Sequence, residues 1–190
     1  MEQEDLKIKV DEAISYVMPL CGQESFRTPD ITTDNLPKNY YSTLNTRTSE
    51  NPSLIILDID QISRDCPRKD AIPDIVEMRI AEEIGQDIFL NQLELQFPNN
   101  DAPLEMLTYV TTTVGHYIGL IYVNRNYKMK DFGIGIDLDG PVGRAYKAAD
   151  EIFIKYEGEK LKELISNPSL LETLTKIYSL RGGKFNDRAN

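Results

Sequence analysis

Histidine, cysteine and tryptophan are almost missing from this chain of 190 residues. It has one histidine, His116, two cysteines, Cys21 and Cys66, and no tryptophan. A structural zinc site needs about four cysteine or histidine ligands at close spacing, so this composition does not predict one. The cysteines stand alone, and charged residues begin at the second position of the chain. We therefore expect no secretory signal peptide and a reducing location, either the cytoplasm or a virion.

Positive charge is also in short supply. The chain has 21 lysines and arginines against 31 aspartates and glutamates, a formal net charge of −10. Surfaces that bind nucleic acids normally carry a basic patch, so this balance argues against broad nucleic-acid binding. The richest basic strip, residues 125–130, is short. Alanine is scarce while isoleucine, asparagine, lysine and tyrosine are plentiful, a bias that suits an AT-rich genome such as that of many phages.

No hydrophobic run is long enough to predict a membrane span. The best candidate, residues 106–123, has no formal charge with a neutral His116, but it contains three successive threonines and its length is marginal. Its apolar residues recur every three or four positions, which predicts the central helix of a bundle. Gly115 and Gly119 leave one face of this helix without side chains, and a partner helix can approach closely there.

Similar apolar stripes predict the other helices. Asp74 and Glu77 have the spacing of a reciprocal N-terminal cap, and Asn167 can cap the last helix. We therefore expect a mainly α fold, a bundle of about five helices in a single domain over residues 1–190, with room for one small β-hairpin. The expected helices are 4–18, 74–97, from 101 to about 123, 141–167, and from 168 to the glycines at 182–183.

Residues 22–53 break this pattern because threonine, serine, asparagine and proline dominate there without a period. Residues 54–62 read equally well as a strand or as a helix. One interpretation of 22–53 is a mobile loop; the other is an arm that becomes ordered on a neighbouring subunit of a homo-oligomer. The apolar anchors of such an arm would be Phe26, Ile31, Leu36, Tyr40 and Tyr41. At the C-terminal end of the sequence, residues 184–190 are expected to form a polar, mobile tail.

Two acidic pairs suggest an alternative that involves catalysis. Asp58 and Asp60 follow one apolar run, and Asp137 and Asp139 follow another, with His116 between them. This order resembles the motifs of archaeo-eukaryotic primase-polymerases over about 80 residues. The resemblance implies a mixed sheet whose strand ends hold Mg²⁺ for nucleotidyl transfer.

Simpler interpretations account for these residues. The run from Asp137 to Pro141 is typical of a turn followed by a helix N-terminus, where acids are favoured. Because His116 falls inside a predicted helix, we expect it to be a hydrogen-bonded core residue. Residues 79–87 resemble the zinc-protease helix, but Glu82 and Gln86 stand where that site needs histidines.

The chain is therefore expected to be a non-catalytic assembly or adaptor protein. It would bind copies of itself or other proteins, for example as a virion connector-type subunit, with no metal or cofactor. The alternative is a small Mg²⁺-dependent nucleotidyl- or phosphoryl-transfer enzyme that uses Asp58, Asp60, Asp137, Asp139 and His116.

Overall fold

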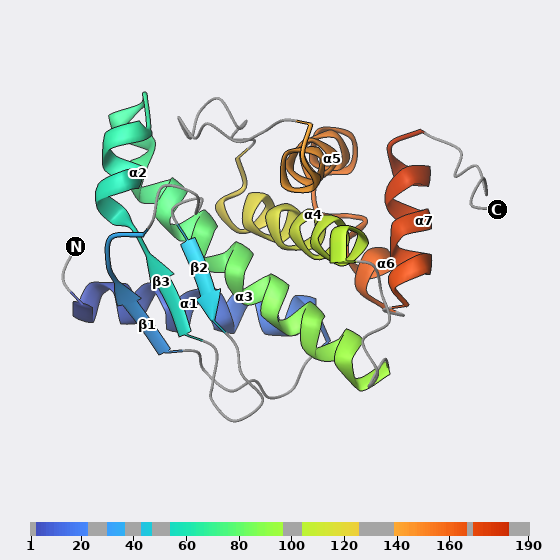
Figure 1. Cartoon of the computed structure of the whole chain (residues 1–190), viewed down its shortest axis with the longest axis horizontal. Coiled ribbons are helices and arrows are strands. Elements are labelled where there is room, and N and C mark those ends of the chain that lie inside the picture. Colours follow the sequence, from blue (N-terminus) through green and yellow to red (C-terminus); the bar gives the residue numbers. More distant parts are fainter. Residues whose placement is uncertain are drawn as a thin grey trace.

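The fold is mainly α, as the apolar stripes predict (Figure 1). Within the described residues the chain forms seven α-helices, one short 3-10 helix and three strands. Two of the helices, α2 (Ile59–Asp65) and α6 (Leu161–Ile165), are too short to produce a periodic stripe in the sequence. The computed structural model describes residues 3–22, 30–36, 43–46, 54–96, 104–125, 139–166 and 169–182.

Helix α4 (Leu104–Val123) is the centre of the bundle. It packs between α3 (Ile72–Gln96) and α5 (Pro141–Tyr156), and every residue from Tyr109 to Leu120 is buried. The prediction of a central helix at 106–123 is therefore confirmed. Within the described ranges, no helix combines the length and the apolar character that a membrane crossing requires.

The two glycines of α4 set its distance from α3. A Cβ atom on Gly115 would lie 2.3 Å from Cγ of Gln86 and 2.9 Å from the main-chain oxygen of Glu82. A Cβ atom on Gly119 would lie 2.8 Å from the main-chain oxygen of Met78. Since real Cβ atoms do not approach other atoms this closely, α3 and α4 can touch along this face only because both residues are glycine.

Helix α1 (Gln3–Leu20) packs against α3 and closes one side of the bundle. Its predicted stripe is the buried face, so this prediction is also confirmed. The residues of this stripe recur every three or four positions, as a helix that faces the core requires. The buried residues of the stripe are Leu6, Val10, Ala13, Ile14 and Val17.

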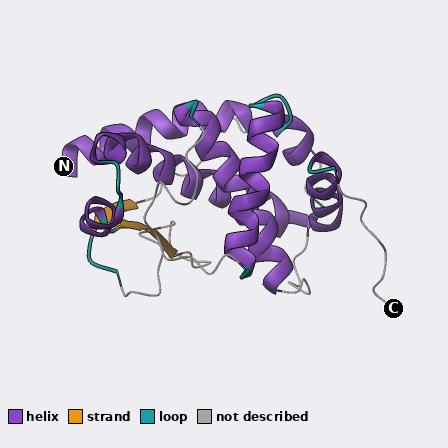
Figure 2. Ribbon diagram, turned by 90° about the horizontal axis from the view of Figure 1, so that it is seen from above, coloured by secondary structure: helices purple, strands orange, loops and turns teal. Residues whose placement is uncertain are grey.

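The ambiguous segment 54–62 contains both a strand and a helix. Strand β3 (Leu54–Leu57) ends at Asp58, and α2 begins at the next residue. Two parts of the predicted arm pair with β3: β1 (Asp30–Thr33) in parallel and β2 (Thr43–Thr46) as an antiparallel hairpin partner. The order is β1-β3-β2, and Figure 2 shows the strands to one side of the helices.

The expectation of one long helix over 141–167 is wrong. Helix α5 ends at Tyr156 because Glu157 adopts a left-handed backbone conformation with φ 50°. The next positions on its apolar stripe are Glu159 and Lys160, so a continued helix would bury nothing there. The chain turns and forms α6, which packs against α4 and α7 (Leu170–Leu180).

Two predicted caps also differ from the structure. Helix α3 begins at Ile72, directly after the 3-10 helix η1 (Lys69–Ala71), so Asp74 lies inside its first turn. Asp74 accepts from Nη1 of Arg125 at 2.5 Å, and Glu77 pairs with Lys9 of α1. Helix α7 is capped by Ser169, whose hydroxyl accepts from the N–H of Glu172. The cap predicted at Asn167 lies outside the described residues.

Substitution of alanine for Gly119 tests the close approach of α3 and α4. Helix propensity favours alanine by about 1 kcal/mol, but overpacking against a main-chain oxygen costs about 1–3 kcal/mol. Because a main-chain oxygen cannot move aside as a flexible side chain can, we expect the upper end of this cost, so that Gly119→Ala lowers the free energy of unfolding by about 2 kcal/mol in urea denaturation. Gly158→Ala is the control, because its new Cβ would meet Ile121 at 3.4 Å, an ordinary contact. A Gly119→Ala protein as stable as wild type would contradict this packing.

Candidate functional site

Asp58, the first acid of the catalytic alternative, is a structural cap. Its side chain is almost fully buried, with 4% exposed. One carboxylate oxygen accepts from the N–H of Gln61 at 2.7 Å, and the other accepts from the N–H of Leu36 at 2.9 Å. Asp58 therefore caps α2 and also binds the main chain that follows β1. Asp60 lies in the first turn of α2 and is exposed.

The second acidic pair precedes helix α5. Gly140 occupies the N-cap position of α5, and Pro141 is the first residue of the helix. The helix therefore begins at the residue that the sequence predicts. The N-cap residue is Gly140, and the main-chain oxygen of Asp139, one residue earlier, accepts from Nη1 of Arg144 at 2.5 Å. Asp137 lies outside the described residues.

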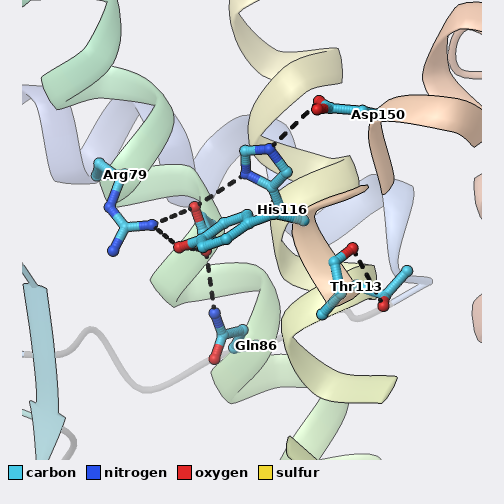
Figure 3. A network of polar contacts seen from close by, with 8 residues as sticks. Arg79, Gln86, Thr113, His116 and Asp150 are labelled. Atoms are coloured by element: carbon cyan, nitrogen blue, oxygen red, sulfur yellow. Dashed lines mark hydrogen bonds and ion pairs between the residues drawn. The ribbon is translucent and has the colours of Figure 1, made fainter. Parts of the chain in front are cut away.

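The described members of the acidic pairs, Asp58, Asp60 and Asp139, are not gathered around His116, whose acidic neighbours are Glu82 and Asp150. Helix α2 and the start of α5 lie in separate parts of the molecule in Figure 1, and His116 points into the bundle between α3 and α5 (Figure 3). Among the residues that the structure describes, no group of three or more histidine, cysteine or acidic side chains is arranged to hold a metal ion. A contact of Asp137 with His116 or with the other acidic residues stays a prediction.

His116 belongs instead to a network of buried charges, which we call the charge cluster. Figure 3 shows its members reaching one another from α3, α4 and α5. Except for Asp150, whose side chain is 15% exposed, the charged side chains of the cluster are almost fully buried. The cluster consists of Arg79 and Glu82 of α3, His116 of α4, and Tyr146 and Asp150 of α5.

Glu82 is the centre of the charge cluster. Arg79 donates from Nη1 to Oε2 of Glu82 at 2.7 Å, and the hydroxyl of Tyr146 donates to Oε1 at 2.8 Å. Arg79 also donates to the hydroxyl of Tyr146, which closes a ring of three groups. Gln86 adds a longer contact to Oε1 at 3.4 Å. Each carboxylate oxygen therefore has two polar neighbours, Tyr146 and Gln86 at Oε1 and Arg79 and His116 at Oε2.

His116 lies between two carboxylates. Its Nδ1 is 3.3 Å from Oε2 of Glu82, and its Nε2 is 3.7 Å from Oδ1 of Asp150. The imidazole ring also meets the ring of Tyr146 edge to face, with centroids 4.3 Å apart. The expectation that His116 is a hydrogen-bonded core residue fits this position.

Contacts within the cluster favour the charged forms of His116 and Glu82. Burial by itself would lower the pKa of His116, but the contacts with Asp150 and Glu82 outweigh burial and raise it. Burial would raise the pKa of Glu82, but Arg79 and His116 outweigh burial and lower it. Burial raises the pKa of the Tyr146 hydroxyl well above its usual value, so this group stays neutral. Two cations thus face two carboxylates across three helices.

These properties suit a structural cluster better than a catalytic one. A general base needs a free lone pair and a pKa near the working pH. Both ring nitrogens of His116 face carboxylates, and its raised pKa favours the protonated ring, which has no lone pair to offer. The sequence alone hides this cluster, although one signal exists: Arg79 and Glu82 stand among the isoleucines and valine of a predicted buried face.

An open pocket lies elsewhere, between α1, α2 and α3. It has a volume of about 610 Å³, and we call it the three-helix pocket. Isoleucines, a valine and a proline form most of its lining, and Ile8 is 53% exposed at its edge. The lining residues are Asp5, Ile8, Lys9 and Glu12 of α1, Ile59 and Ser63 of α2, and Ile72, Pro73 and Val76 of α3.

The predicted arm anchors are only partly described. Leu36 is half-buried, and its main-chain N–H is bound to Asp58 of the same chain. The main chain of Ile31 lies in β1, opposite Ile55 of β3. Phe26, Tyr40 and Tyr41 lie outside the described residues, so their contact with a neighbouring subunit stays a prediction.

The charge cluster predicts a specific dependence of stability on pH. The folded pKa of His116 is above its usual 6.5, so its contribution is complete below 6.5 and is lost as pH rises through the folded pKa. The folded pKa of Glu82 is below its usual 4.5, so its contribution is complete above 4.5 and is lost as pH falls. Stability from the cluster should be greatest between these values.

We expect wild type to lose more stability than His116→Gln between about pH 5.5 and about pH 8.5, because only wild type carries this titration. Urea denaturation at both pH values measures the difference, which amounts to about 1.4 kcal/mol for each unit by which folding raises the pKa. Equal losses in the two proteins would contradict a protonated His116 in the folded chain.

Asp58 and Asp60 offer a second test, which separates a cap from a metal ligand. Asp58→Ala should lower the free energy of unfolding by about 1–2 kcal/mol, because two main-chain N–H groups lose their acceptor. Asp60→Ala should be nearly silent because this side chain is exposed. Added Mg²⁺ should not shift the melting temperature of Asp58→Ala, of Asp60→Ala or of wild type. A Mg²⁺-dependent stabilisation of wild type that disappears in both variants would support the enzyme instead.

Comparison with known proteins points to no family. Neither protein-family models, curated protein sequences nor solved structures match this chain significantly. Its function therefore has to be inferred from its own geometry: a closed charge cluster inside the bundle and an open apolar pocket on its surface.

Proposed function

We propose that this chain is a non-catalytic adaptor that binds a protein segment in the three-helix pocket. The observation that carries this proposal is the solvent-exposed apolar wall of the pocket. Ile8 points away from the core face of α1, and it stands beside the apolar residues of α2 and α3 that line the same pocket. A concave site with a mainly apolar lining and a few charged groups is the kind of surface that can take up the apolar side chains of a bound segment.

Helix α1 carries two separate stripes, which supports this proposal. Its inner stripe packs against α3. Its outer stripe, Asp5, Ile8, Lys9 and Glu12, has spacings of three, one and three residues and therefore lies along one face. The fold needs the inner stripe, whereas in the outer stripe Lys9 pairs with Glu77 of α3 and Ile8 stays 53% exposed, where a partner can reach it.

The charge cluster supports the non-catalytic part of the proposal. Its ionised groups pair with one another inside the bundle, and its histidine is held between two carboxylates. The composition bias toward an AT-rich genome extends the proposal to a subunit of a virion assembly. In that setting the partner would be either a second copy of this chain or another protein of the same assembly.

Site-specific photocrosslinking tests whether the pocket binds protein. A photoreactive amino acid replaces Ile8 in the pocket or, as a matched control, Leu171 on α7, which is 56% exposed against 53% for Ile8. In cells of the natural source, we expect discrete crosslinked products from position 8 that position 171 does not give. Light scattering of the purified chain tells whether the product is a homo-oligomer. Identical patterns from both positions would contradict the proposal.

A further inference from the structure

We infer that the occupant of the three-helix pocket is a cationic amphipathic helix from a different protein. This inference rests on the function proposed above and adds the chemistry of the partner. Its basis is the charge around the pocket, the spacing of the charged residues along α1, and the apolar lining between them.

The rim of the pocket is acidic. Asp5 and Glu12 line it, and within the described part of the chain neither has a lysine or arginine partner. Lys9, which lies between them on α1, is paired with Glu77 of α3. The lining therefore holds two carboxylates and one cation, and that cation is already paired with Glu77, so Asp5 and Glu12 favour a positively charged partner.

The spacing of the acids on α1 fits a bound helix of at least two turns. Asp5 and Glu12 are seven residues apart, which is two helical turns or about 10 Å. A helix that lies along α1 places apolar side chains on the lining every three or four residues and its lysines or arginines beside the two acids. Four residues beyond Glu12, Tyr16 is 41% exposed and packs edge to face on Tyr122, so an aromatic contact continues the same face.

The same charges disfavour the other occupants. A second copy of this chain has a net charge of −10, and its own α1 would bring acids against acids. Nucleic acids and anionic lipid surfaces are also repelled by an acidic rim. A small apolar ligand would fit the lining, but it would make no use of Asp5 and Glu12, which stand at the two ends of the α1 stripe.

Two model helices test the inference directly. One is an amphipathic peptide of leucine and lysine, and the other has glutamate at every lysine position; both carry a fluorophore for anisotropy titration with the full chain. We expect the lysine peptide to bind at least about tenfold more tightly than the glutamate peptide. The titration is done at about 0.15 M salt, where contacts between distant charges are screened.

Matched variants decide whether binding occurs at the pocket. Ile8→Ser removes apolar contact without a change of charge and should weaken binding of the lysine peptide about tenfold, whereas Leu171→Ser should change it by less than about twofold. Glu12→Gln should weaken binding several-fold, whereas Asp11→Asn, which removes the neighbouring acid outside the pocket, should have little effect. Equal effects of Ile8→Ser and Leu171→Ser, or of Glu12→Gln and Asp11→Asn, would show that binding does not depend on the pocket and would overturn the inference.

Failure of the inference is distinguishable from failure of the proposed function. If position 8 gives crosslinked products but the two peptides bind equally, the pocket binds protein and the inferred charge of the partner is wrong. If light scattering gives a homo-oligomer that Ile8→Ser dissociates, the occupant is a second copy, and again only the inference falls. If neither crosslinking nor either peptide depends on position 8, both are wrong.

Discussion

The ionised carboxylate of Glu82, buried among three helices, is the interaction on which the rest of the bundle depends. It accepts from Arg79 and Tyr146 and lies against His116, so a single group joins α3, α4 and α5. A carboxylate without partners in this place would cost several kcal/mol, and the removal of one member of a buried pair is strongly destabilising. The mutual positions of these helices are therefore constrained by charge as well as by apolar packing.

The glycines of α4 belong to the same constraint. The main-chain oxygen of Glu82 lies 2.9 Å from the place where a Cβ atom of Gly115 would be, one residue before His116. A side chain at this position would push α4 away from α3, and the imidazole would move away from its carboxylate with it. Close backbone packing and the charge cluster thus require each other.

The buried charge cluster and the exposed three-helix pocket lie in different parts of the described chain. The strongest polar chemistry of the described chain is enclosed within α3, α4 and α5, where it pairs with itself. The exposed apolar surface of the three-helix pocket lies where α1 and α2 cover the N-terminal turns of α3. A partner that binds there would contact α1 through its outer stripe and leave the inner stripe in place. Binding by this route needs no rearrangement of the core.

The sequence by itself determined the five longer helices and their inner faces, but not the short α2 and α6. Apolar residues at spacings of three and four predicted the cores of α1, α3, α4, α5 and α7, because a helix must bury one stripe in order to be stable. It also predicted that Gly115 and Gly119 mark a close helix contact. These features are local, since each depends only on the period within one segment.

The tertiary structure decided everything that joins distant segments. Strands β1 and β2 form by pairing with β3, and nothing in their own short polar sequences indicates which strand they meet. The charge cluster unites Arg79, His116 and Asp150, which are far apart in the chain and share no motif spacing. The end of α5 depends on a left-handed residue, Glu157, and on what lies beside it. Periodicity carries no information about such contacts, because they depend on which helix faces overlap after folding.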